Sequence, residues 1–139
     1  MEFKNNGKQV LIRLDDGDEV VASLKEVCRR EGIGSALVSG IGAAKRAEIA
    51  HYDTKEKRYN TIKLEGMLEI VSLSGNMARL EGEAVAHLHI AISRHDFSTL
   101  SGHLMKAEIC PNCEIVLIPL GSEIERKFDE RTGLNLQHY

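Results

Sequence analysis

The spacing of apolar and polar residues predicts one helix that is followed by many strands. A strand is expected at 9–14, and the acidic turn at 15–18 then offers a helix cap. Between about 18 and 31 the apolar positions recur at helical spacing, and glycines at 32 and 34 end the segment. The next stretch, 35–44, reads as a strand in which internal glycines indicate a bulge or a close backbone approach.

Shorter alternating segments fill the remainder of the chain, and turn residues separate most of them. The segments that predict strands are 46–52, 59–64, 66–73, 77–80, 83–93, 99–104, 106–118 and 123–129. Turns are expected at 53–57, 74–76 and 95–98, a kink at Pro111, and a polar tail from residue 129. One helix with many hairpin-joined strands is typical of an α+β fold and not of a βαβ repeat. We therefore expect a single compact domain over 1–139, with a core of about 8–133 and a largely antiparallel sheet packed on the main helix.

Three histidines give this pattern its chemical interest. His87 and His89 are two residues apart in a strand, so their side chains leave the sheet on one face. If opposed residues of the following hairpin sum to about 192, His89 faces His103, and directly opposed Cβ atoms lie roughly 5 Å apart. The sequence thus predicts that three imidazoles converge on one patch of sheet.

Neutral imidazole binds zinc, iron, nickel or copper, and three protein nitrogens with an open fourth position form a catalytic type of zinc site. We predict a transition-metal site, with zinc as the first candidate, at His87, His89 and His103. His51 is a candidate fourth ligand from another strand. Glu69 and Glu114 are candidates to orient a ligand histidine. The alternative is that the histidines are structural and only make hydrogen bonds.

Two other readings of these motifs are weaker. A cupin metal site needs a glutamate soon after His-x-His, and here no carboxylate occurs before Asp96. Cys110 and Cys113 lack the second cysteine pair of a structural zinc site. They also lie among strand-like residues, whereas a redox cysteine is favoured at a helix N-terminus.

The composition of the chain limits its possible binding partners and its cellular location. The 139 residues carry a formal charge of −3, which disfavours DNA binding by one subunit because phosphate contacts need a basic surface. Three cysteines do not form a disulfide framework and indicate a reducing compartment. The sequence shows no signal-peptide layout and no apolar run of about 20 residues. We therefore expect a cytoplasmic protein with no membrane association.

The ordered motifs of the chain resemble the PPC domain (plants and prokaryotes conserved domain). The resemblance runs over about 8–133. It rests on Arg13-Leu14 before the acidic turn and helix, Gly34-Ser35-Ala36, Ser39-Gly40-Ile41-Gly42-Ala43, Tyr52-Asp53, Leu68 to Asn76, His87-Leu88-His89, Gly102-His103-Leu104 and Glu114-Ile115-Val116. Ser101 departs from the pattern, because a glycine is usual there.

The resemblance implies a compact α+β subunit that assembles as a homotrimer. In plants such domains are attached to AT-hook segments that bind DNA, and they mediate contacts with protein partners. This chain has no Arg-Gly-Arg-Pro hook, so it looks like the free-standing prokaryotic type. DNA therefore stays a candidate partner by association, against the charge.

Three functions remain open at this point. The first is a trimeric binding module with a three-histidine metal site, DNA-associated or regulatory. The second is a metal-dependent enzyme of unknown substrate, for which Glu69, Glu83 and Glu114 are the strand-borne candidates for a general base. The third is a protein-interaction scaffold without metal.

Overall fold

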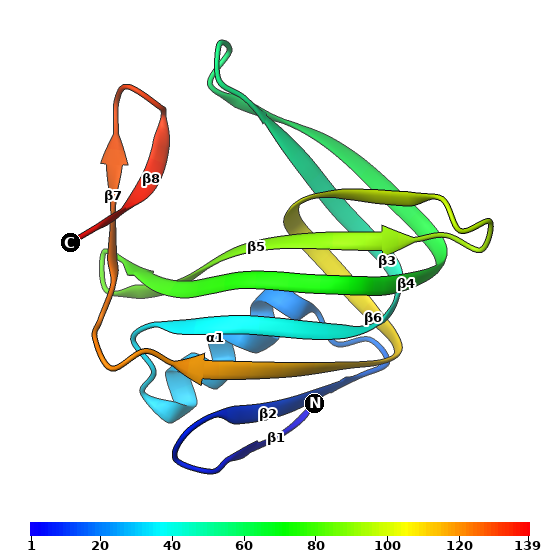
Figure 1. Cartoon of the computed structure of the whole chain (residues 1–139), viewed down its shortest axis with the longest axis horizontal. Coiled ribbons are helices and arrows are strands. Elements are labelled where there is room, and N and C mark those ends of the chain that lie inside the picture. The colour runs from blue at the N-terminus through cyan, green and yellow to red at the C-terminus, as the bar shows by residue number, and fades with distance from the viewer.

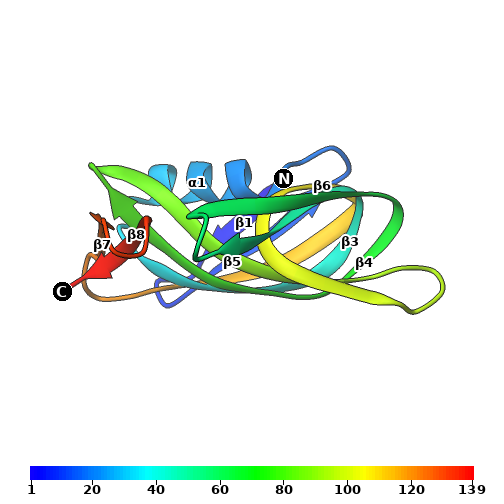
Figure 2. The same cartoon turned by 90° about the horizontal axis from the view of Figure 1, so that it is seen from above.

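A computed structural model describes all residues, 1–139, as one eight-stranded sheet that curves beside a single helix (Figures 1 and 2). The elements are β1 (Glu2–Asn5), β2 (Val10–Asp15), α1 (Val20–Glu31), β3 (Ala36–Asp53), β4 (Arg58–Leu80), β5 (Glu83–Ser93), β6 (Thr99–Pro119), β7 (Glu125–Asp129) and β8 (Leu134–His138). The predicted α+β fold, with a mostly antiparallel sheet and one helix, is confirmed.

Strand pairing closes part of the sheet into a ring. The main order is β1-β2-β6-β3-β4-β7-β8, and β5 pairs with both β4 and β6. Since β3 also lies between β4 and β6, the four long strands form a closed circuit. All these pairings are antiparallel, and the single parallel bridge joins β4 to β7. Closure fixes the positions of β5 and β6, the two strands that carry the histidines.

The helix begins and ends where local chemistry requires. The Glu19 side chain accepts hydrogen bonds from the backbone N–H groups of Val21 and Ala22 at 3.1 and 2.7 Å, and Gly32 ends the helix in the left-handed conformation. The cap is therefore Glu19 and not the acidic turn before it, and the helix starts two residues later than predicted. Its apolar side is fully buried against the sheet, with Leu24 and Val27 at 0% exposure.

Several predicted boundaries in the middle of the chain are wrong, because 59–64, 66–73 and 77–80 form one strand, β4, and 99–104 and 106–118 form one strand, β6. The expected turn at 74–76 does not exist, because β4 continues through it and Gly75 pairs with Leu88 of β5. Likewise 36–44 and 46–52 are a single strand, β3, whose register shifts next to Gly42 and Ala44. The expectation of a bulge at these glycines is confirmed. Pro111 lies within β6, so the kink expected there does not end the strand.

The two ends of the chain add strands that local patterns did not predict. β1 pairs with β2 at the N-terminal edge of the sheet. The expected polar tail instead forms β8, which pairs with β7 as an antiparallel hairpin (Figure 1). A hydrogen bond of 2.6 Å from the Tyr52 hydroxyl to the carbonyl of Thr132 ties the hairpin's turn to β3. No helix in the structure is long and apolar enough to span a membrane.

Candidate metal centre

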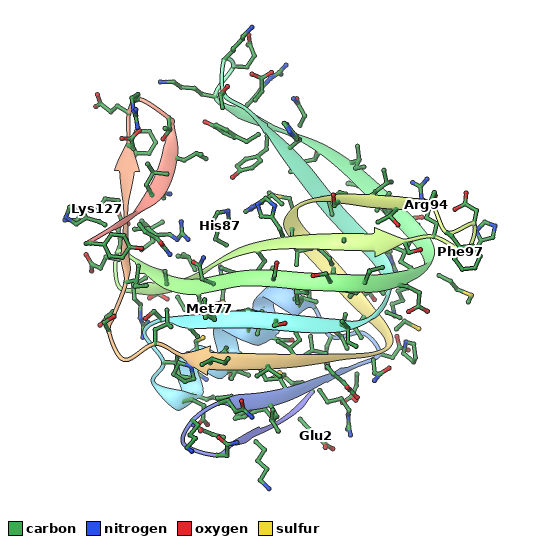
Figure 3. The ribbon with its side chains drawn as sticks, in the orientation of Figure 1. Glu2, Met77, His87, Arg94, Phe97 and Lys127 are labelled. Atoms are coloured by element: carbon green, nitrogen blue, oxygen red, sulfur yellow. The ribbon has the colours of Figure 1, made fainter.

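The three predicted histidines lie on neighbouring strands and form one cluster. In the β5–β6 hairpin His89 pairs directly with His103, so the register expected from the sequence is confirmed. His87 lies two residues before His89 in β5, so both side chains are on the same face of the strand. Figure 3 shows His87 projecting from β5 toward the side on which the β7–β8 hairpin stands.

The geometry of the cluster suits a small cation. One ring nitrogen from each histidine lies within 4.8 Å of the others, and the ring centroids are 5.3, 5.5 and 5.7 Å apart. Zinc–nitrogen bonds are about 2.0–2.1 Å, so a tetrahedral ion holds its ligand nitrogens about 3.3 Å apart. Small side-chain rotations would bring the three rings to that spacing. The donor set of three imidazoles therefore fits zinc or a similar transition metal.

Electrostatics keep two of the three rings neutral. Burial, helped by the neighbouring His87 and His89, lowers the pKa of His103 to about 4. Burial also lowers the pKa of His87, and the positive charge of Arg126 acts in the same direction. The Nδ1 atom of His103 is buried and has no hydrogen-bond partner within the protein. A neutral ring with an unpaired buried nitrogen is the form that a metal ion requires.

Two glycines let the backbones approach closely beside the cluster. A Cβ on Gly75 would overlap the carbonyl oxygen of His87 on the paired strand. A Cβ on Gly102 would lie 2.7 Å from the carbonyl oxygen of Ala50 on β3. Each glycine is adjacent in the ladder to a histidine, so glycine at both positions sets the spacing of the strands that carry the rings.

Aromatic side chains form one wall of the site. The ring of Tyr59 stacks on His103 with centroids 5.0 Å apart and an interplanar angle of 28°, and Tyr52 meets Tyr59 edge-on. Tyr52 and Tyr59 line an open hollow of about 620 Å³, together with the three histidines. The hydroxyl-bearing residues around it are Ser72, Ser74, Ser101, Tyr52 and Tyr59. The hollow has room for a small molecule next to the three rings.

The other candidate residues do not join the cluster. His51 lines the same hollow but lies outside the group of three histidines. Glu69 and Glu114, the candidates for orienting a ligand histidine, do not line the hollow. Glu83, at the far end of β5, also lies outside it.

Sequence reasoning missed one residue of the site, Arg126 of β7. Its terminal nitrogens donate to the side-chain oxygen of Asn76 at 2.8 Å and to the carbonyl of Asn135 at 3.0 Å. Asn76 pairs with His87 in the β4–β5 ladder, so the guanidinium is held beside the cluster. Only the docking of the β7–β8 hairpin brings Arg126 there, and its neighbours in the sequence carry no signal of it.

Known structures closely match this fold. A protein from Bacteroides thetaiotaomicron described as a putative DNA-binding protein is 29% identical, with a TM-score of 0.94 over 99% of this chain and 96% of that one. A protein from Archaeoglobus fulgidus described as metal-containing is 40% identical, with a TM-score of 0.90 over 99% and 97%. A plant- and prokaryote-conserved (PPC) protein from Pyrococcus horikoshii is 32% identical, with a TM-score of 0.88 over 99% and 95%.

Sequence comparison agrees with the structural similarity. No curated protein matches the chain in sequence. The sequence profile of the Plants and Prokaryotes Conserved (PCC) domain, in contrast, matches residues 1–121, which include the helix, the long strands and all three histidines of the cluster. The β7–β8 hairpin lies beyond the matched region. This chain belongs to the Plants and Prokaryotes Conserved domain family.

Proposed function

We propose that the chain is a metal-binding module of this family, in which His87, His89 and His103 hold one transition-metal ion, with zinc as the first candidate. The carrying observation is that their ring nitrogens lie within 4.8 Å of one another. The low pKa of His103, about 4, supports the proposal, because protons then compete little with the metal at neutral pH. The similar protein from Archaeoglobus fulgidus is described as metal-containing, which agrees with it.

Metal analysis of the purified, tag-free protein tests this proposal. We expect about one metal ion per chain in the parent. In His89→Ala, which removes one of three ligands, we expect only a small fraction of that metal content. His95→Ala is the matched control, because His95 is an exposed turn residue outside the cluster. Full metal content in His89→Ala, measured on folded protein, would contradict the assignment.

A metal-dependent enzyme is the second candidate. It is favoured by the hollow of about 620 Å³ beside the cluster, since three protein ligands leave a coordination position open. A bound metal would supply Lewis acidity at that position. The residues around the hollow contribute hydroxyl groups and imidazoles, and none of the carboxylates Glu69, Glu83 and Glu114 lines it. Metal-dependent turnover of ester, phosphoester or amide substrates would establish this function.

We also propose that the protein assembles as a homotrimer, as the family resemblance implies. The sheet surface formed by β2, β3 and β6 supports association between copies. It exposes a row of large apolar side chains, namely Leu11 (43%), Leu37 (50%), Ile41 (60%) and Ile118 (43%). The mass in solution, measured by light scattering for the parent and for Ile41→Glu, decides the assembly state. A monomeric parent would refute it.

Association with DNA is a weaker proposal. Its support is that similar proteins are described as putative DNA-binding proteins. The formal charge of −3 opposes it, because binding to phosphates releases counterions and needs positive charge. Titration with duplex DNA at low and moderate salt shows whether the protein binds DNA, since binding to phosphates must weaken as the salt concentration rises.

The three free cysteines, Cys28, Cys110 and Cys113, fit a protein of a reducing compartment such as the cytoplasm.

A further inference from the structure

Arg126 carries a positive charge that no carboxylate of the chain neutralises. None of the ion pairs in the structure involves this residue. Its hydrogen bonds go to two neutral oxygens, the amide oxygen of Asn76 and the carbonyl oxygen of Asn135. The side chain is partly buried, and burial lowers the pKa of its guanidinium. An arginine that is kept out of water without an acidic partner is costly, so its environment calls for an anion.

The location of Arg126 points to the histidine cluster. Arg126, His87 and His103 line one hollow of about 330 Å³, and residues of β8 line it as well. Tyr59, His87, His103 and Leu134 line both this hollow and the larger one, so the two spaces adjoin at the cluster. The hairpin is held in place at its turn, where Lys57 donates to the carbonyl of Glu130 at 2.5 Å. Arg126 is thus a fixed part of the site.

The charge around the cluster has one sign. Neither hollow is lined by an aspartate or a glutamate. A divalent metal on three neutral imidazoles would add two positive charges to that of Arg126, and the site would then hold about three positive charges without a protein anion. The complementary ligand is negatively charged, because the Coulomb attraction is large where water is partly excluded.

The unused donors of Arg126 specify the chemistry further. A guanidinium has five N–H donors in a planar fork, and two of them are used by Asn76 and Asn135. The Nε–H is buried and has no acceptor in the protein. Planar forks of this kind match the oxygens of carboxylate and phosphate groups. The hydroxyls of Ser72, Ser74 and Ser101 offer further donors around the larger hollow.

We propose that the site binds a small oxyanion, a carboxylate or phosphate group of a small molecule, between the metal ion and Arg126. This inference rests on the proposed metal centre. Arg126 would bind and orient the anionic group, and a metal ion held by the three histidines would offer a coordination position to one of its oxygens. The β7–β8 hairpin therefore sets ligand specificity, although it lies outside residues 1–121, which the family profile matches.

Cobalt(II) provides a test with a spectroscopic readout. The metal-free protein is loaded with cobalt in a buffer free of phosphate and of carboxylates, and the visible absorption of the bound ion reports its ligands. Inorganic phosphate and acetate are then titrated separately, which distinguishes the two kinds of anion. Arg126→Gln removes the charge of interest, and Lys127→Gln is the matched control. Lys127 is the next residue on β7, is exposed, and points away from the molecule (Figure 3).

The parent and Lys127→Gln should show the same anion-dependent change of the cobalt spectrum with at least one of the two anions. Arg126→Gln should bind cobalt at the same stoichiometry. Its affinity for the anion should be at least about tenfold lower, which is the usual effect of losing a charged hydrogen bond. If Arg126→Gln does not fold, Arg126→Lys replaces it. Lysine keeps the charge but loses the fork, and a several-fold weakening is expected.

The outcomes separate this inference from the proposed function. A parent that binds no cobalt removes the metal centre itself, and the oxyanion site with it. A parent that binds cobalt but responds to neither anion overturns the inference and leaves the metal centre standing. Equal anion affinity in the parent and the Arg126 variants would likewise overturn the inference and leave the metal centre standing. A response to duplex DNA alone, with none to phosphate or acetate, would also overturn it.

Discussion

Lowering the pH of the metal-free protein should destabilise it through His103. The pKa of His103 is about 4 in the folded protein, whereas an unfolded histidine has its ordinary value of about 6.5. Between these values the unfolded chain binds more protons than the folded one, so stability must fall as the pH falls from 6.5 toward 4. The effect is absent above the unfolded value, because both states are then unprotonated.

The magnitude follows from the difference of the two pKa values. At pH 4.5 the full shift corresponds to about 2.5 kcal/mol of lost stability, and partial exposure of the ring to solvent reduces this to about 1–2 kcal/mol. The lowered pKa of His87 adds a contribution of the same sign. A loss of this size is a substantial part of the total stability of a small domain, about 5–15 kcal/mol.

Urea unfolding of the metal-free parent and of His103→Gln, each at pH 7 and pH 4.5, isolates the contribution of this residue. Glutamine keeps a polar side chain at the position but does not titrate. The parent should lose about 1–2 kcal/mol more than the variant over this interval. Equal losses would refute the reasoning, and so would an NMR titration of the His103 ring with a midpoint near the ordinary value.

The remaining predictions concern the metal and two local features of the backbone. Zinc at about 100 times its dissociation constant should stabilise the parent by about 2.7 kcal/mol, and so raise its Tm by about 5–10 °C in a thermal scan; an equal rise in His89→Ala would contradict the metal site. Glu19→Ala should cost about 1–2 kcal/mol in urea unfolding, because the N–H groups at the start of α1 lose their acceptor; no change would show that the cap is dispensable. Gly75→Ala should cost about 1–3 kcal/mol and reduce metal content, because the new Cβ meets the backbone of His87. Gly121→Ala is its control, since a Cβ there meets nothing within 4 Å, and equal stability of the two variants would exclude this explanation.

The amino-acid sequence alone determined the features that depend on near neighbours in the chain. The 3.6-residue spacing located α1, because a helix satisfies its own backbone and needs only one apolar side. The 2-residue spacing placed His87 and His89 on one face, and the short turn after β5 fixed the register that brings His89 opposite His103. The convergence of the three imidazoles could therefore be predicted without the fold.

Tertiary structure decided the features that depend on distant segments. Ser74-Gly75-Asn76 has the composition of a turn, yet it lies within β4, because pairing with β5 on one side and β3 on the other outweighs the local preference. Likewise β8 was predicted as a polar tail, since a two-stranded hairpin carries little signal of its own and is stabilised by docking. That docking places Arg126 beside His87, 39 residues away in the sequence, and so decides the charge of the site. Local spacing can place metal ligands on a strand, but the docking of the β7–β8 hairpin determines which charged side chain lies beside them.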